Sequence, residues 1–132
     1  MTTERFRFAF DPRFAPALAL VGIRAATCEV VLDDARLDVR FGRLRLVTPI
    51  SNLADVQVTR DYRAFKAIGP RMSRADRGVT FGTNPRAGTC VCFHEPVPAL
   101  LGRRFPHPAL TVTVEDPKAL AEAIGRRLRA RA

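Results

Sequence analysis

Two successive β-hairpins within residues 28–48 constrain the fold more than any other feature of the sequence. The apolar segment 28–32 leads through Asp33-Asp34 into a second apolar segment, and Gly42-Arg43 separates that segment from a third. A two-residue loop with glycine first is typical of a type II′ turn, whose twist matches that of the strands it joins. Such a turn predicts three cross-strand pairs: Phe41 with Leu44, Arg40 with Arg45, and Val39 with Leu46. The hairpins therefore predict an antiparallel meander with one apolar face and one face exposed to water.

Other segments alternate between apolar and polar residues, as half-buried strands do. Residues 5–10 place three phenylalanines on one face, namely Phe6, Phe8 and Phe10. Further strands are predicted at residues 55–60, 79–81, 89–93 and 110–114. The stretches 61–78 and 95–107 are predicted to lack regular structure, the second because it is rich in proline. Residues 12–23 leave two alternatives open: a short helix after Pro16, or a strand over 17–23.

The chain closes with a well-marked helix, predicted over residues 117–129. Asp116 is a suitable N-cap, and Pro117 occupies the first helical position, where proline is favoured. Four apolar residues at helical spacing form one stripe, and three polar residues point away from it. The stripe is Leu120, Ala121, Ile124 and Leu128, and the polar residues are Glu122, Arg126 and Arg129. Arginines near the C-terminal end of a helix also stabilise its dipole, so they need no partner.

Six to eight antiparallel strands followed by one amphipathic helix define an α+β fold, in which the helix covers the open end of a curled sheet. With 132 residues, the chain is predicted to be a single domain spanning 1–132. Three further motifs are Leu37-x-Val39-x-Phe41-Gly42 after the aspartate turn, Thr48-Pro49-Ile50, and Leu53-x-x-Val56. These motifs resemble those of bacterial pleckstrin-homology-like (PH-like) domains. Segments 69–78, 80–84 and 107–114 resemble small proteins of this kind with no assigned activity. The resemblance implies a curled antiparallel sheet or barrel, inter-strand loops that contact anionic ligands, and a groove beside the helix that takes peptides.

The formal net charge of +9 is concentrated in two segments. Residues 60–86 contain seven basic side chains against two acidic ones, and residues 117–132 contain five against one. Such a field favours anionic partners: an anionic ligand, an acidic protein surface or, by peripheral contact, a membrane. The alternative is that the 20 arginines and two lysines reflect composition and form a solvated surface.

The basic stretch within 61–78 is the strongest candidate for a binding site. Arginines recur every three residues between two glycines, so guanidinium groups and backbone amides are able to converge on an anion. The predicted anion-binding residues are Arg63, Lys66, Arg71, Ser73, Arg74 and Arg77. Local ion pairs with Asp76 are the competing interpretation, and such exposed pairs contribute little to stability.

Cys90-x-Cys92-x-His94, with His107 returning from a later segment, is a weaker candidate for a zinc site. Two thiolates and two imidazoles satisfy tetrahedral zinc, but the one-residue spacing is shorter than usual, and cysteine is also a common buried hydrophobe. The sequence contains no nucleophile elbow and no phosphate-binding Gly-Lys-Ser/Thr loop, and its paired carboxylates are limited to Asp33-Asp34, which are better explained as turn formers. It therefore predicts a non-enzymatic protein of unknown function, with no cofactor and no metal.

The remaining sequence features narrow the class of partner and the compartment. The single Tyr and the absence of Trp disfavour nucleic acid, because stacking platforms are scarce. No apolar run approaches the length of a membrane span, no secretory signal is evident, and three cysteines do not make a disulfide framework, so a cytoplasmic protein is predicted. Two alternative roles stay open: a carrier of a small apolar ligand inside the barrel, and a structural domain that dimerises through an exposed sheet edge.

Overall fold

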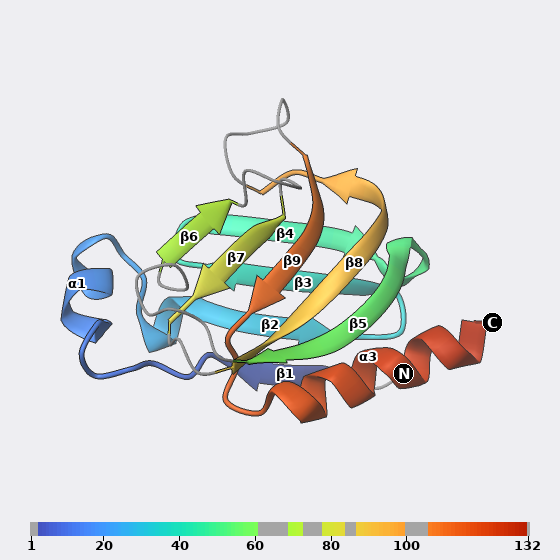
Figure 1. The fold of residues 1–132 in the computed structure, drawn as a ribbon, viewed down its shortest axis with the longest axis horizontal. Coiled ribbons are helices and arrows are strands. Elements are labelled where there is room, and N and C mark those ends of the chain that lie inside the picture. Colours follow the sequence, from blue (N-terminus) through green and yellow to red (C-terminus); the bar gives the residue numbers. More distant parts are fainter. Residues whose placement is uncertain (1–2, 61–68, 73–77, 84–86, 100–105, 132) are drawn as a thin grey trace.

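The computed structural model describes residues 3–60, 69–72, 78–83, 87–99 and 106–131. Two β-sheets pack against each other, and one long helix runs along the side where the edges of the two sheets lie open (Figure 1). The described strands are β1 (Glu4–Arg7), β2 (Cys28–Leu32), β3 (Arg36–Phe41), β4 (Leu44–Pro49), β5 (Leu53–Arg60), β6 (Gly69–Met72), β7 (Val79–Gly82), β8 (Ala87–Val97) and β9 (His107–Val112). The helices are α1 (Ala15–Leu20) and α3 (Pro117–Arg131), with 3-10 turns η1 (Ala25–Thr27) and η2 (Ile50–Asn52).

The first sheet is the predicted meander, with strand order β1-β2-β3-β4. All three predicted cross-strand pairs are confirmed: Phe41 with Leu44, Arg40 with Arg45, and Val39 with Leu46. Gly42 has φ +63°, the left-handed value that the predicted turn requires at its first position. Local turn chemistry was therefore sufficient to fix this register.

The second sheet corrects the prediction in three respects. Its order is β5-β8-β9-β7-β6, and β7 pairs with β9 in parallel, so the sheet is mixed rather than antiparallel. The two sheets stay separate instead of closing into a barrel, and nine strands are described rather than six to eight. The parallel pair forms because β9 inserts between β8 and β7, and alternation within a strand carries no information on which neighbour it takes.

The two stretches predicted to lack regular structure, 61–78 and 95–107, both contain β-strand residues. Residues Gly69–Met72 form β6, which pairs with β7 as an edge strand. At the other stretch, β8 continues through Pro96 to Val97, and β9 begins at His107. Pro96 is tolerated because the register of the β8–β9 ladder shifts between Cys92 and Val97, so no regular ladder bond from its nitrogen is needed.

The N-terminal region resolves the alternatives at residues 12–23 in favour of a helix. α1 spans Ala15–Leu20, begins with proline in its first turn, and buries Leu18. The preceding strand is shorter than predicted, since β1 ends at Arg7 and Phe8 forms only an isolated bridge to Val114. Phe8 is nevertheless buried, so the predicted apolar face of this segment does meet the core.

The C-terminal helix α3 begins as predicted and continues to Arg131. The Asp116 carboxylate accepts a hydrogen bond from the backbone N–H of Ala119 at 3.1 Å, which confirms the cap. Leu120 and Ile124 are fully buried against the second sheet, where α3 contacts β5 and β8. At the centre of the core, Phe41 of the first sheet stacks on Phe81 of the second, with ring centroids 4.8 Å apart.

Candidate functional site

The predicted anion-binding residues lie mainly outside the described residues. This holds for Arg63, Lys66, Ser73, Arg74 and Arg77, while Arg71 lies in β6 with its backbone opposite Thr80. The segment is nevertheless not one continuous loop, because β6 divides it. The part 61–68 joins β6 at Gly69 and the part 73–77 leaves it at Met72, two positions about 10 Å apart along an extended strand.

The four residues of the zinc alternative do not form a metal site. Cys90 and Cys92 are half-buried, His94 is exposed, and His107 is fully buried. Within the described part of the chain, no three or more His, Cys, Asp or Glu side chains are arranged to hold a metal ion. The register explains the difference, since His107 lies opposite Val97, beyond the irregular part of the β8–β9 ladder.

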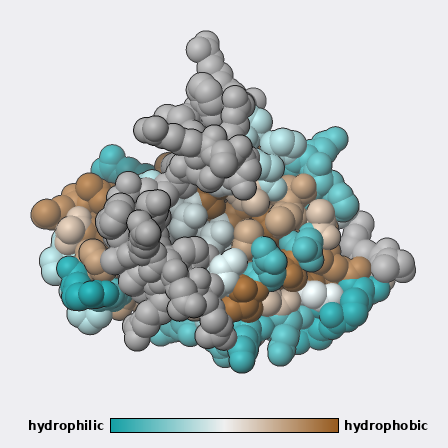
Figure 2. Space-filling view, viewed as in Figure 1, coloured by the Kyte–Doolittle hydropathy of each residue, from teal (hydrophilic) through white to brown (hydrophobic). Residues whose placement is uncertain are grey.

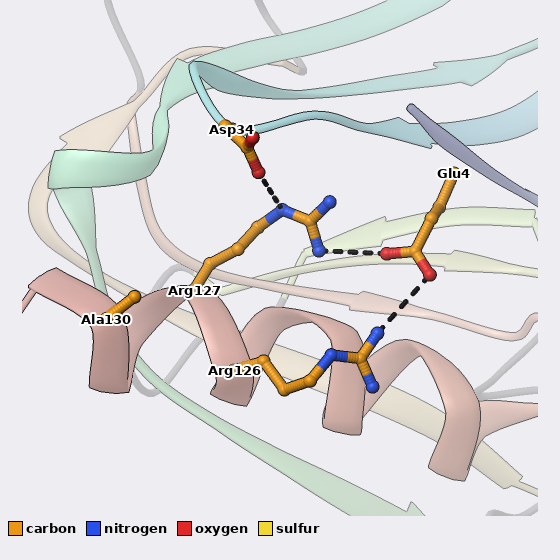
Figure 3. Close-up of a pocket in the computed structure, with 5 residues that line it drawn as sticks. All are labelled: Glu4, Asp34, Arg126, Arg127 and Ala130. Atoms are coloured by element: carbon orange, nitrogen blue, oxygen red, sulfur yellow. Dashed lines mark hydrogen bonds and ion pairs between the residues drawn. The ribbon is translucent and has the colours of Figure 1, made fainter. Parts of the chain in front are cut away.

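The helical end of the molecule holds an ion-pair cluster around a pocket of about 300 Å³ (Figure 3). Arg127 is the central residue, with only 10% of its side chain exposed. Its Nη1 donates to Glu4 Oε2 at 2.8 Å, and its Nε donates to the Asp33 carbonyl at 3.1 Å and lies 3.4 Å from Asp34 Oδ1. Arg126 Nη2 approaches the other oxygen of Glu4 at 3.3 Å. These contacts join α3 to β1 and to the β2–β3 turn, so two cations of the basic C-terminal segment are neutralised internally.

A second pocket, of about 510 Å³, lies between η2 and the end of β8. Its wall is fixed by Asn52, whose side chain donates to the Glu95 carbonyl at 2.9 Å and accepts from the Glu95 N–H at 2.8 Å. Three prolines line it, namely Pro49, Pro96 and Pro98. The charged or titratable lining is limited to His94 and Glu95, so this cleft does not favour an anion.

The opposite end of the molecule has a different character. A pocket of about 350 Å³ is lined by the last residues of α1 and by two arginines: Ala19, Leu20, Val21, Gly22, Arg24 and Arg43. Both arginines are exposed, and neither forms an ion pair with the residues that the structure describes. Among the residues that the structure describes, no carboxylate lines this pocket. We call Leu20, Val21, Arg24 and Arg43 the basic tip.

The basic tip is assembled by contacts between two loops. The Gly42 N–H donates to the Thr27 carbonyl at 3.2 Å, and the Thr27 hydroxyl donates to the Gly22 carbonyl at 2.8 Å. A Cβ at Gly42 would lie 3.0 Å from Ile23 Cγ1, so a larger residue does not fit there without a shift. The β3–β4 turn is thus packed on the α1–β2 connection, which brings Arg43 and Arg24 to the same pocket.

Sequence reasoning did not single out either arginine of the basic tip. Arg43 was recognised only as a turn residue, and Arg24 follows a segment whose structure was undecided. The available signal was the unbroken run Leu20-Val21-Gly22-Ile23, followed by Arg24, at the end of a short apolar segment. Arg24 is brought close to the β3–β4 turn by a tertiary contact, and a pattern along one strand does not encode such a contact.

Comparisons of the chain with protein-family models, with curated proteins and with solved structures give no match. Across the described ranges, neither α1 nor α3 has the combination of length and apolar character that a bilayer-crossing helix requires.

Proposed function

We propose that this chain is a non-enzymatic, PH-like binding domain of the cytoplasm that engages an anionic ligand or an acidic protein surface. The four-stranded meander, the second sheet and the C-terminal helix along the open side support the PH-like assignment, and the parallel β7–β9 pair departs from it. The three cysteines are free thiols, which is in keeping with a reducing compartment. Burial raises the pKa of the Cys28 thiol, which disfavours the reactive thiolate that a catalytic cysteine needs.

The observation that carries this proposal is the contrast in how the arginines are paired. Arg127, Arg45 and Arg13 each lie within 2.8 Å of a carboxylate oxygen. Arg24 and Arg43 instead share a pocket that no carboxylate of the described residues lines. Guanidinium groups that are not neutralised by the fold are available to a phosphate, sulfate or carboxylate. The basic residues within 60–86 also raise the positive charge of the chain.

The carrier alternative is not supported by the packing between the sheets. Phe41 and Phe81 stack there with their ring planes 4° apart, and both side chains are fully buried. These rings occupy the space that an apolar ligand would need. We therefore place binding at the surface.

Retention on immobilised heparin tests the proposal, because heparin presents closely spaced sulfates and carboxylates. We expect the wild-type chain to be retained, and the double variant Arg24→Ser/Arg43→Ser to elute at a lower salt concentration. The matched control is Arg40→Ser/Arg129→Ser, which removes the same charge from two other exposed sites. Equal elution of the two double variants would show that net charge alone determines retention. Failure of the wild-type chain to bind would reject the anionic partner.

Arg71→Ala/Arg74→Ala tests the contribution of the predicted basic stretch in the same assay. A lower elution salt than that of the control variant is expected if these two side chains extend the binding surface. Elution at the same salt concentration as the control variant would limit the anion-binding surface to the basic tip.

A further inference from the structure

Two adjacent aliphatic side chains at the basic tip are exposed to solvent. Leu20 is 88% exposed and Val21 is 65% exposed, whereas 23 hydrophobic residues of the described chain are buried in the core. Figure 2 shows the resulting hydrophobic surface at the end of the molecule where Figure 1 places α1. The two side chains are adjacent and form a contiguous apolar patch, and its burial against an apolar partner would be favourable.

The exposed pair is held in place by the fold. Leu18 and Ile23, on either side of it in the sequence, are buried, with 5% and 4% exposed. Backbone hydrogen bonds close the turn: Val21 N–H and Ile23 N–H both donate to the Leu18 carbonyl, at 3.1 and 3.0 Å. Gly22 provides the left-handed φ of +84° that this turn needs. The two buried residues thus anchor a compact projection that presents Leu20 and Val21 outward.

The surroundings of the pair identify the chemistry of its partner. Leu20 and Val21 share their pocket with Arg24 and Arg43, and with no carboxylate from the described part of the chain. Aliphatic side chains flanked by guanidinium groups match the boundary between the acyl chains and the headgroups of an anionic bilayer, where apolar groups enter and cations remain with the phosphates. Protein interfaces instead favour aromatic anchors, and the exposed large hydrophobics of the described chain are all aliphatic.

We propose that the basic tip is a membrane-docking site that inserts Leu20 and Val21 into the interface of an anionic phospholipid bilayer. The inference rests on the proposed function and names its partner, with Arg24 and Arg43 contacting lipid phosphates. Docking by so few side chains is reversible, since two aliphatic groups and two arginines supply only modest membrane affinity.

Co-sedimentation with vesicles tests this proposal. We expect the wild-type chain to bind phosphatidylcholine vesicles that contain about 30% phosphatidylglycerol, and to bind pure phosphatidylcholine weakly. Leu20→Ser/Val21→Ser should lower the partition coefficient by about tenfold or more, because the inserted apolar surface is lost. Arg24→Ser/Arg43→Ser should lower it by about 25-fold, from about fivefold for each arginine. The control Val47→Ser, at another exposed aliphatic residue, should bind as wild type does.

The heparin assay separates failure of this inference from failure of the proposed function. Leu20→Ser/Val21→Ser should elute from heparin with the wild-type chain, because no charge is changed. Retention on heparin without binding to the anionic vesicles would overturn membrane docking and indicate a soluble anionic partner. Loss of both would reject the proposed function as well. If the Leu20→Ser/Val21→Ser variant binds the anionic vesicles as strongly as the wild-type chain does, the proposed insertion is also overturned.

Insertion has a direct optical readout, because the chain contains no tryptophan. Leu20→Trp places a single indole at the basic tip, and we expect its emission to shift to shorter wavelength when anionic vesicles are added. Val47→Trp is the matched control, since Val47 lies on β4 outside the basic tip, and its emission should not change. If the emission spectrum of Leu20→Trp is unchanged when the protein is bound to vesicles, the basic tip does not enter the bilayer.

Discussion

The two ends of this molecule use the same residue types in opposite ways. At one end, α3 buries Leu120 and Ile124 completely, and the guanidinium of Arg127 is held by carboxylates and backbone carbonyls. At the other end, α1 leaves Leu20 exposed, and Arg24 and Arg43 line the same pocket, where the described ranges place no carboxylate. Figure 1 shows α1 and the C-terminal end of α3 at opposite ends of the long axis.

This comparison shows that residue type alone does not separate structural from functional arginines. Arg126 and Arg127 of α3 belong to a more basic segment of the sequence than Arg24 and Arg43 do, yet both form ion pairs within the fold. What differs is the presence of β1 and of the β2–β3 turn beside α3, which supply Glu4, Asp33 and Asp34. The predictions below test each side of the comparison.

The largest expected effect is at the buried face of α3. Ile124→Ala should lower the free energy of unfolding by about 2–5 kcal/mol, because it removes a fully buried side chain and leaves a cavity. Leu20→Ala is the matched truncation at the other end and should change stability by less than about 0.5 kcal/mol. Urea denaturation measures both. Similar losses for the two variants would contradict the contrast in packing.

The next effect concerns the ion-pair cluster. Arg127→Ala should lower the free energy of unfolding by about 2 kcal/mol, since it removes charge-assisted hydrogen bonds from a largely buried side chain. Arg126→Ala is the control, because Arg126 pairs with the same Glu4 but is 57% exposed, and an exposed pair contributes under about 1 kcal/mol. Denaturant midpoints of both variants, compared with wild type, check the ranking. A greater loss for Arg126→Ala would show that exposure is the wrong criterion.

At the basic tip, the turn should matter more than the side chains it presents. Gly42→Ala should cost about 1–2 kcal/mol, because φ of +63° is strained for an L-residue and the new Cβ meets Ile23 and the Gly22 carbonyl. Arg43→Ala should leave the free energy of unfolding nearly unchanged, since this arginine is exposed. Thermal unfolding of the two variants distinguishes the contribution of the turn at Gly42 from that of the exposed Arg43 side chain. A stable Gly42→Ala variant would show that the two loops are not coupled as the structure indicates.

The smallest effect is a pH dependence at the α3 end. Hydrogen bonds from the backbone N–H groups of Arg36 and Ala35 hold the pKa of Asp33 below its ordinary value, and a hydrogen bond from Arg45 does the same for Asp38. A lowered native pKa stabilises the fold fully above the ordinary value of about 4, and this contribution is lost as the pH falls from there through the lowered native pKa. Asp33→Asn keeps an oxygen that accepts both N–H groups but does not titrate.

We therefore expect the difference in unfolding free energy between pH 6 and pH 3, measured by urea titration, to be smaller for Asp33→Asn than for wild type. An identical difference would mean that Asp33 does not contribute to the acid sensitivity of this end. The stability of Arg24→Ser/Arg43→Ser should show the wild-type pH dependence, since none of the described residues that line that pocket is a carboxylate.

Much of the local structure could be predicted from the sequence because its causes are local. Gly42-Arg43 specified the register of β3 and β4, and Asp116-Pro117 marked the start of α3. The candidate site was less predictable. Charge density directed attention to residues 61–78, where β6 was missed, and Arg24 and Arg43 were overlooked because they lie 19 positions apart in the chain. Neither residue is unusual until the two loops that carry them meet.

The amino-acid sequence by itself determined the strand-rich α+β class, the meander, the capped C-terminal helix and the excess of positive charge. These follow from alternation, turn residues and composition, which act over a few residues. Only the tertiary structure decided the order of the second sheet, the parallel pairing of β7 with β9, and which arginines are neutralised. Those outcomes depend on which segments, distant in the sequence, pack against each other. Patterns among neighbouring residues do not specify that packing.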